Sequence, residues 1–415
     1  MAMTWGARWR QAVAAGGVLL VALLGPARGI AVPATAASPG PVSLHRFGSP
    51  EAFVAGNAEG VQPGGGGIML AGDAAAGAWL SPLVDPGFPF TRLIASWNSA
   101  TPPGSRIRVE ARATTDAGSS TRWYVLGLWT DSVDAGQSTS VPGQADADAR
   151  VATDTLLAQG RPLVAYQLRV TLERPTPMDP SPTVRLLAAV AAAAPSPMPD
   201  GVSPPGGAAG IELPVPAYSQ EIHAHQYPQW GGGGEAWCSP TATEMVVESW
   251  GRGPSPDELA WVDPTYADPS VDVAARSTYD AAYRGTGNWP FNTAYAARYG
   301  LEAFVTQLRS LAEAERFIMA GIPLVASIAA GPHELDGFLF PGGTSGHLVV
   351  VVGFDGASNP IVNDPAAWSD ASVRRVYGRG QFERAWLRGS GGVVYVVHPP
   401  DVPLPPLVPG APPNW

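Results

Sequence analysis

Residues 230–250 read WGGGGEAWCSPTATEMVVESW, and this stretch decides the fold that we expect around it. A run of glycines gives way to apolar side chains that recur at helical spacing, so we predict a helix that begins just after Cys238. Ser239 can cap this helix and Pro240 suits its first turn, while Gly251 ends it. The pattern therefore places the cysteine at a helix N-terminus.

Cys238 is the only cysteine of the chain. A thiol at a helix N-terminus faces unpaired backbone N–H groups and the positive end of the helix dipole, and both favour the thiolate, which is the nucleophilic form. The alternative is a small buried apolar residue, because most free cysteines have that role. Cys238 is thus a candidate nucleophile whose role depends on the rest of the chain.

The composition restricts the class of protein. The chain has 415 residues, which is too many for one typical core, so we expect two domains. Hydrophobic residues make up 45% and charged residues 14%, which favours a folded protein. The net charge of -10 argues against nucleic acid or an anionic membrane surface as a partner. The 49 glycines and 44 prolines predict many turns and argue against an all-helical fold.

Residues 1–37 have the pattern of an export signal peptide. Arg8 and Arg10 precede an apolar run at 12–24, and the small residues at 34–36 form a cleavage site. A retained membrane anchor is the alternative, but the apolar run is short for a bilayer span. We therefore expect a secreted or cell-surface protein with no membrane span after signal removal. A single unpaired thiol outside the cell is an oxidation liability, which favours a chemical role for it.

The remaining chain divides by composition into two domains, a linker and a tail. Residues 38–190 alternate short strand-like runs such as 106–112 with turn-rich joins, which predicts an all-β sandwich. Residues 191–210 are rich in Pro, Ala and Gly and form a linker. Residues 211–400 make the second domain, and 401–415 are a Pro-rich tail that we expect to be extended along the surface or disordered.

The second domain mixes helical and strand signals. Ser255 and Ser310 each begin a capping box, and a short helix is expected at 292–299 between them. The strand candidates follow the helices, at 323–328, 347–354, 360–364 and 392–397. Helices followed by strands indicate an α+β domain with an antiparallel sheet.

A cysteine nucleophile needs a base, and the base needs an orienting group. His347 opens an apolar strand after a glycine-rich loop, so a rigid element holds it while its ring can reach a neighbouring site. The turn at Asp355 sends the chain back to Asn363 and Asp364, and Asp364 follows the histidine by 17 residues. Successive strand residues face opposite sides, so one of the two orients the imidazole. We prefer Asp364, because an ionised carboxylate stabilises the imidazolium.

Acyl transfer also needs a donor for the oxyanion. The backbone N–H of Cys238 is one such donor, and an upstream glutamine side chain is the usual second kind. Gln220 follows an apolar segment that should be fixed against the domain. Gln226 and Gln229 are rivals that lie closer in sequence, so the choice among the three stays open at this point.

Four motifs together carry a resemblance to a known family: VPAYSQ at 215–220, WCSPT at 237–241, GHLVVVVGF at 346–354 and VNDP at 362–365. They resemble the C-thirty-nine-like branch of the papain-like cysteine peptidases, in the order found there. The resemblance covers roughly 211–400 and is similar to secreted actinobacterial members. The expected fold class is therefore an α+β papain-like cysteine peptidase domain preceded by an all-β sandwich domain.

The same resemblance implies the roles of individual residues. It implies Cys238 as nucleophile, His347 as base, Asp364 as orienting group and Gln220 in the oxyanion hole. The 18-residue separation of Gln220 and Cys238 departs from the family, where the gap is usually much shorter. The intervening insert can form part of a substrate wall.

We expect a secreted cysteine hydrolase that cleaves a peptide or amide bond of a peptide or protein substrate. One alternative is an inactive module that binds cell-wall polysaccharide or protein, with Trp97, Trp123 and Trp129 as a stacking platform, although such residues are more often core. Another is acyl transfer to an amine through the same thiolate. No cofactor or metal is expected, because the sequence has no HExxH motif, no paired cysteines and no glycine-rich dinucleotide loop.

Overall fold

The computed structural model describes residues 37–38, 40–194, 196–197 and 202–415. The expected signal peptide therefore lies outside the described residues except for its last position, and so does part of the expected linker. These described residues belong to one compact unit. Among the described residues, none of the helices combines the length and the apolar character that a bilayer crossing demands.

The N-terminal part, residues 40–194, is built of two antiparallel sheets and one short helix, α1 (Pro50–Val54). The seven-stranded sheet contains β2 (Val42–Phe47), β4 (Val61–Gly64), β5 (Gly67–Leu70), β7 (Arg92–Ala100), β10 (Ala149–Ala152), β11 (Thr155–Ala158) and β13 (Thr183–Ala192). The five-stranded sheet contains β3 (Asn57–Glu59), β6 (Ala76–Leu80), β8 (Arg106–Thr115), β9 (Tyr124–Trp129) and β12 (Leu163–Glu173). A separate strand pair joins β1 (Ala37–Ser38) to β14 (Ser196–Pro197).

Of the three tryptophans considered as a stacking platform, Trp97 and Trp129 belong to the core of this part, whereas Trp123 is half-buried. Trp97 and Trp129 are 0% and 1% exposed, and their rings contact Phe291 of the C-terminal part at centroid distances of 6.0 and 5.2 Å. The ring of Trp123 lies under the guanidinium groups of Arg112 and Arg169, at 4.9 and 4.3 Å. Buried rings cannot present their faces to a saccharide, so the core interpretation of Trp97 and Trp129 holds.

The C-terminal part, residues 202–415, has a six-stranded antiparallel sheet in the order β15-β20-β16-β17-β18-β19. The strands are β15 (Glu302–Gln307), β16 (Leu324–Ala330), β17 (Thr344–Phe354), β18 (Pro360–Asn363), β19 (Arg374–Val376) and β20 (Val393–His398). The helices are η1 (Gln220–His223), η2 (Gly234–Ala236), α2 (Cys238–Ser249), α3 (Pro256–Leu259), α4 (Pro269–Thr278), α5 (Trp289–Ala297), α6 (Leu311–Met319), α7 (Asp370–Val373) and α8 (Arg379–Ser390).

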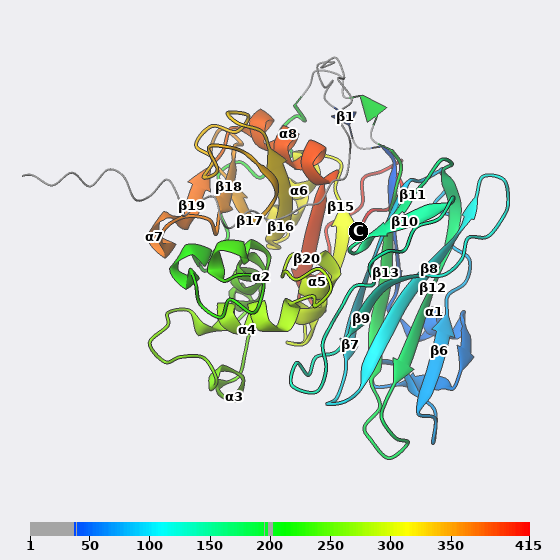
Figure 1. Ribbon diagram of the computed structural model, residues 1–415. Helices are drawn as coiled ribbons and strands as arrows, with labels where there is room; N and C mark the ends of the chain where they lie inside the picture. Colours follow the sequence, from blue (N-terminus) through cyan, green and yellow to red (C-terminus); the bar gives the residue numbers. More distant parts are fainter. Residues whose placement is uncertain (1–36, 39, 195, 198–201) are drawn as a thin grey trace, which may run out of the picture. The chain divides into compact units, whose positions relative to one another are not determined.

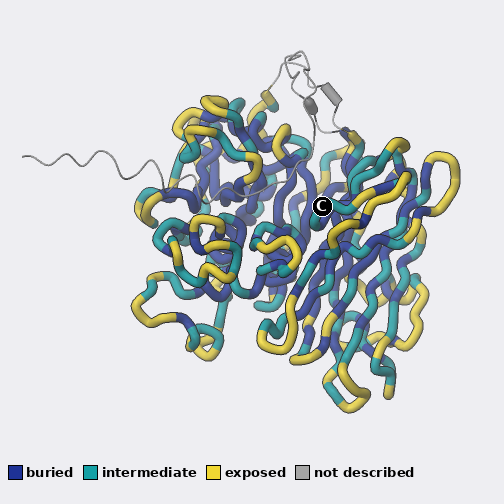
Figure 2. Tube along the Cα trace, in the orientation of Figure 1, coloured by how far each residue is buried: buried dark blue, intermediate teal, exposed yellow. Residues whose placement is uncertain are grey.

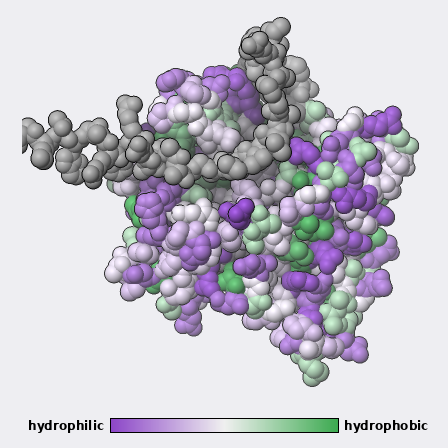
Figure 3. All heavy atoms as spheres, in the orientation of Figure 1, coloured by the Kyte–Doolittle hydropathy of each residue, from purple (hydrophilic) through white to green (hydrophobic). Residues whose placement is uncertain are grey.

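Helices α2, α4 and α5 lie next to one another, and α2 packs on β17 while α5 packs on β15 (Figure 1). Long strands such as β7, β13 and β20 are buried along most of their length, whereas many loops are exposed (Figure 2). On the described surface that Figure 3 presents, apolar residues stand out singly or in small groups among hydrophilic ones. The apolar surface is thus used mainly between the sheets and helices, where burial stabilises the fold.

The order of elements differs from the expected one. The predicted capping box at Ser255 is present at the start of α3. At Ser310 only half of the predicted box forms: Ser310 caps α6, but the Glu313 side chain accepts the backbone N–H of Arg309 instead. Helices and strands alternate, however, because β15 comes before α6 and α8 comes before β20. The sequence pattern missed α4, β15 and α8. The expectation of helices first and strands afterwards was therefore wrong, although the sheet is antiparallel.

The end of the tail is not a loose surface segment. The Asn414 side chain is fully buried and donates to the Gln307 carbonyl and to Glu313, each at 2.9 Å. The Trp415 ring is 7% exposed and contacts Phe317 at 5.2 Å. The expectation of a tail that is extended along the surface or disordered is wrong for these two residues. A proline-rich composition does not indicate that Asn414 and Trp415 are buried against the domain.

Candidate active site

Cys238 is the first residue of α2, so the helix begins one residue earlier than predicted. The N-cap is Trp237, and among the described residues no side chain caps this helix end. Ser239 was predicted as the cap, which is wrong: it lies inside the helix, and its hydroxyl is 2.9 Å from the hydroxyl of Tyr395. The thiol of Cys238 therefore stands beside unpaired helix N–H groups, and its side chain is partly exposed.

His347 lies on β17, which pairs with β16 and packs against α2. The histidine is only 1% exposed. Its ring meets the edge of Phe340 at 4.9 Å and the ring of Phe338 at 6.2 Å, and both aromatic residues come from the loop between β16 and β17. The imidazole is thus held by the sheet on one side and covered by aromatic rings on another.

Asp364 follows the last residue of β18 and contacts His347. The distance from His347 Nε2 to Asp364 Oδ1 is 2.7 Å, and Asp364 is fully buried. The same oxygen accepts the backbone N–H of Ala366 at 3.1 Å, while the hydroxyl of Tyr377 donates to Oδ2 at 2.8 Å. The hairpin therefore brings together the two residues that the sequence pattern paired, and it adds Tyr377, which the sequence analysis missed.

The pKa shifts at this site have opposite signs on the two partners. Burial lowers the pKa of His347, but the Asp364 carboxylate and the Cys238 thiol outweigh it and raise this pKa to about 10. Burial raises the pKa of Asp364, and the hydrogen bonds and charge of His347 and Tyr377 outweigh it and hold this pKa below its ordinary value. The arrangement therefore favours an imidazolium beside a carboxylate, with the thiol within reach of the same ring.

Asn363, the alternative orienting residue, has another partner. Its side-chain amide donates to the carbonyl of Pro216 at 2.9 Å and to that of Val215 at 3.4 Å. It thus faces the segment that leads to Gln220, as the alternation of side chains along a strand requires. Asn363 holds this segment in place, and Asp364 contacts the histidine.

Gln220 lies between the elements of the site in spite of the insert. Its backbone N–H donates to the carbonyl of Pro365 at 2.8 Å, and its side-chain Nε2 donates to the carbonyl of Glu235 at 3.0 Å. A Cβ on Gly234 would lie 2.2 Å from the Gln220 carbonyl oxygen, so the glycine run permits the close approach of η1 and η2. The insert therefore folds back and returns Gln220 to the residues just before Cys238.

The two rival glutamines point elsewhere. The side-chain oxygen of Gln226 is 2.9 Å from Nδ1 of His223, a buried histidine of the insert. Gln229 is exposed. Of the three glutamines left open by the sequence, Gln220 alone is buried and bonded to the backbone next to Cys238. Among the described residues, no three His, Cys, Asp or Glu side chains gather in a way that could hold a metal ion.

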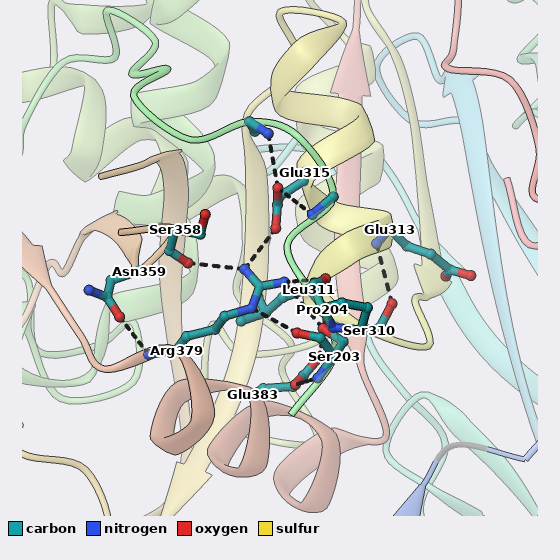
Figure 4. Close-up of polar contacts among 12 residues, drawn as sticks. Ser203, Pro204, Ser310, Leu311, Glu313, Glu315, Ser358, Asn359, Arg379 and Glu383 are labelled. Atoms are coloured by element: carbon teal, nitrogen blue, oxygen red, sulfur yellow. Dashed lines mark hydrogen bonds and ion pairs between the residues drawn. The ribbon is translucent and has the colours of Figure 1, made fainter. Parts of the chain in front are cut away.

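A buried ion-pair network surrounds Arg379, the first residue of α8 (Figure 4). The guanidinium of Arg379 contacts Glu315 at 2.7 Å and the carbonyl of Ser358 at 3.0 Å. It also donates to the carbonyl of Ser203, and Glu315 accepts the backbone N–H of Ala208 at 2.9 Å. The network ties the segment that enters the C-terminal part to the start of α8.

Comparisons with known proteins match two ranges of the chain. Residues 43–192 match a family model described as "Peptidase C39 N-terminal domain", whose label denotes its actinobacterial form. Residues 212–393 match a model described as "Peptidase_C39 like family". The chain belongs to the C39-like peptidase family. It is a C39-like peptidase family protein of the actinobacterial type, in which the matched C-terminal range contains Gln220, Cys238, His347 and Asp364.

Other comparisons with this C39-like protein gave little. No curated protein matches it. Solved structures with some similarity include one of infectious bursal disease virus, Gt strain (TM-score 0.21, 12% identity, covering 41% of this chain and 36% of that chain). Another is the Clostridium thermocellum endo-1,4-β-D-xylanase 10B with its CBM22-1 and GH10 modules (TM-score 0.17, 9% identity, covering 46% of this chain and 31% of that chain). The chain thus spans about a third of the length of these structures, and such low TM-scores support no conclusion.

Proposed function

We propose that this C39-like protein is a secreted papain-like cysteine hydrolase that cleaves a peptide or amide bond through Cys238, His347 and Asp364. The observation that carries the proposal is the buried 2.7 Å contact of His347 with Asp364, on an imidazole whose pKa also responds to the Cys238 thiol. A cysteine at the start of a helix that packs on an antiparallel sheet, with the histidine on that sheet, is the arrangement of a papain-like α+β domain. Neither a binding module nor a structural cysteine requires a charged pair beside the thiol.

In the proposed reaction, the proton of the Cys238 thiol lies on His347 Nδ1 before the substrate binds, and Asp364 stabilises the imidazolium of this thiolate–imidazolium pair. The sulfur then attacks the carbonyl carbon of the substrate. The carbonyl oxygen becomes an oxyanion, which accepts hydrogen bonds from the backbone N–H of Cys238 and from the side-chain amide of Gln220. Each donor is fixed before the substrate arrives, so little reorganisation is needed when charge develops.

The tetrahedral intermediate then loses its amine. The imidazolium of His347 gives its proton to the leaving nitrogen, the C–N bond breaks, and a thioester remains on Cys238. A water molecule next loses a proton to His347 and attacks the thioester, and the carboxylic acid product leaves as the thiol is restored. An amine in place of this water would give acyl transfer instead of hydrolysis, so the same site serves both reactions.

Alkylation of Cys238 by iodoacetamide, measured against pH, tests the proposal. The expected result is labelling well below the ordinary pKa of a thiol, with a loss of this acid-side reactivity in His347→Ala. Cys238→Ser should fold normally, resist labelling and lack turnover of a peptide library. Asn363→Ala is the matched control and should keep the acid-side reactivity. A wild-type thiol that reacts only after unfolding would overturn the proposal and favour an inactive binding module.

A further inference from the structure

The Asp364 carboxylate has hydrogen-bond partners on both of its oxygens. Oδ1 faces Nε2 of His347 at 2.7 Å and accepts the N–H of Ala366 at 3.1 Å. Oδ2 accepts the hydroxyl of Tyr377 at 2.8 Å. Asp364 and Tyr377 are 0% and 1% exposed, so bulk water is not an alternative partner for this oxygen. The hydroxyl of Tyr377 thus supplies the hydrogen bond that Oδ2 of Asp364 accepts.

Tyr377 is itself held rigidly. Its backbone N–H donates to the carbonyl of Pro360 at 3.2 Å, which ties it to the first residue of β18. Its ring stacks on Phe382 of α8 at a centroid distance of 6.2 Å and an interplanar angle of 15°. The ring of Phe338, from the loop between β16 and β17, contacts it at 6.3 Å. Two residues later the buried network of Arg379 anchors the start of α8 (Figure 4). The ring therefore has little freedom to move away from the carboxylate.

We propose that Tyr377 is a positioning residue of the active site: its hydroxyl holds the Asp364 carboxylate in the orientation in which Oδ1 supports the His347 imidazolium. This inference rests on the proposed function, and it adds a fourth side chain to the three of the hydrolytic site. Tyr377 does not contact the reacting sulfur or the substrate, and it acts only through Asp364. No proton moves from it during the reaction.

The physical reason is the cost of an unsatisfied charge in the interior. A carboxylate rotates readily about its Cβ–Cγ bond, and a buried carboxylate oxygen without a donor carries a desolvation penalty. Without the hydroxyl of Tyr377, Asp364 would turn toward other donors or take up a proton more easily. Either change removes negative charge from the Nε2 side of His347. The imidazolium would then be less stable, and so would the thiolate of Cys238 that pairs with it.

Other charged groups act on the same pair and are unchanged by removal of the hydroxyl. His347 also faces the Cys238 thiol of α2, and its charge acts on the Glu221 carboxylate of η1. Tyr377 also faces Arg375 of β19. Glu221 in turn interacts with Glu235 of η2. Because these groups remain in place in Tyr377→Phe, a shift of the pH profile in this variant would report on the contact with Asp364.

The test compares Tyr377→Phe with Tyr166→Phe in the whole protein. Tyr166 is a buried tyrosine of the N-terminal part whose hydroxyl lies 3.3 Å from the carbonyl of Ala189, so its variant also loses a buried hydroxyl. Tyr377→Phe should lower kcat/KM about tenfold, mostly through kcat. It should lower the pKa of His347, measured by NMR of the ring, by about one unit. It should also move the acid side of the Cys238 alkylation profile to higher pH, because the thiolate loses part of the stabilisation that the imidazolium gives it. Tyr166→Phe should leave both pH profiles unchanged.

A double variant tests whether Tyr377 acts through Asp364. In an Asp364→Asn background the carboxylate is already absent, so adding Tyr377→Phe should reduce the remaining activity by less than twofold, because coupled residues are not additive. A full tenfold further loss would overturn the inference, and so would an unchanged His347 pKa in the single variant.

The experiments distinguish a failure of the positioning role of Tyr377 from a failure of the proposed hydrolase function. If wild-type Cys238 were inert, the hydrolase proposal would fail, yet the NMR titration of His347 would still decide whether Tyr377 acts on it. If wild-type protein were active and Tyr377→Phe had the same pH profile and kcat, only the positioning role would fall.

Discussion

The side-chain amide of Gln220 donates to the main-chain carbonyl of Glu235 at 3.0 Å, across an insert that separates them by 15 residues. Glu235 lies in η2, three residues before Cys238, so this bond fixes the glutamine next to the helix that begins with the cysteine. The amide nitrogen carries two hydrogens and uses one of them here. The second hydrogen points toward Glu221 Oε1, which lies 3.4 Å from the amide nitrogen, a long contact that a stronger acceptor can replace.

The first prediction concerns this second hydrogen. Gln220→Ala should lower kcat by about 10²- to 10³-fold with a small change in KM, because an oxyanion donor acts in the transition state. Gln229→Ala is the control, since Gln229 is exposed, and it should keep full activity. Steady-state kinetics on a cleaved peptide would measure both. If kcat fell equally in Gln220→Ala and Gln229→Ala, Gln220 would not be an oxyanion donor.

The residues around Cys238 and His347 could be predicted because the signals that mark them are local. A cysteine at the start of a helical pattern, a histidine at the start of an apolar strand and a turn before Asp364 all lie within short stretches. Tyr377 could not be found in this way. It reaches Asp364 from beyond β19, and only the pairing of β18 with β19 brings it there.

The errors have the same origin. Ser239 has the sequence context of a helix cap, but the helix begins one residue before it. The hydroxyl of Ser239 instead makes a hydrogen bond with the hydroxyl of Tyr395 on a distant strand. Strand β15 and helix α8 were missed because tertiary packing determines them: β15 pairs with β20, and α8 packs along β16. Local propensity is a weak guide where long-range pairing decides the structure.

The second prediction separates the two residues at the end of β18. Asp364→Asn should lower kcat/KM by about 10²-fold or more, because a neutral amide no longer stabilises the His347 imidazolium. Asn363→Ala should cost far less activity, since it loses only its bonds to the backbone of Val215 and Pro216. Kinetics at neutral pH would compare the two. The opposite ranking would transfer the orienting role to Asn363.

The third prediction concerns stability as a function of pH. The pKa of His347 is raised in the folded state to about 10, above its ordinary value of 6.5. This contribution to stability is therefore fully present below pH 6.5 and is lost as the pH rises through about 10. The Asp364 contribution, from a lowered pKa, is present above the ordinary value of 3.8 and is lost as the pH falls below it.

Urea unfolding in a Cys238→Ser background would measure the histidine contribution without titration of the thiol. The free energy of unfolding with His347 present, minus that of the added His347→Gln change, should be constant near pH 6 and should decrease as the pH rises toward 10. A difference that grows with pH over this range would show that the histidine is neutral in the folded protein.

The fourth prediction concerns the ring that joins the two parts of the chain. Phe291 of α5 is fully buried between Trp97 and Trp129 of the N-terminal part. Phe291→Ala should lower the free energy of unfolding by about 3–5 kcal/mol, the usual cost of such a truncation in a core. Val54→Ala, at a side chain that is 71% exposed, should change it by less than about 0.5 kcal/mol. Denaturant unfolding followed by tryptophan fluorescence would measure both values, and a small loss in Phe291→Ala would show that the two parts are stable without this contact.

The fifth prediction concerns the end of the tail. Trp415 donates from its indole N–H to the carbonyl of Pro405 at 2.7 Å and packs on Phe317 of α6. Trp415→Ala should therefore lower the free energy of unfolding by about 3 kcal/mol or more, even though the tail reads as loose proline-rich chain. Leu407→Ala, in the same tail but with a side chain that is 43% exposed, is the matched control and should cost less than about 1 kcal/mol. Since neither residue contacts the His347–Asp364 pair, both variants should keep the pH profile of Cys238 alkylation. A Trp415→Ala protein as stable as the control would show that the tail does not anchor the fold.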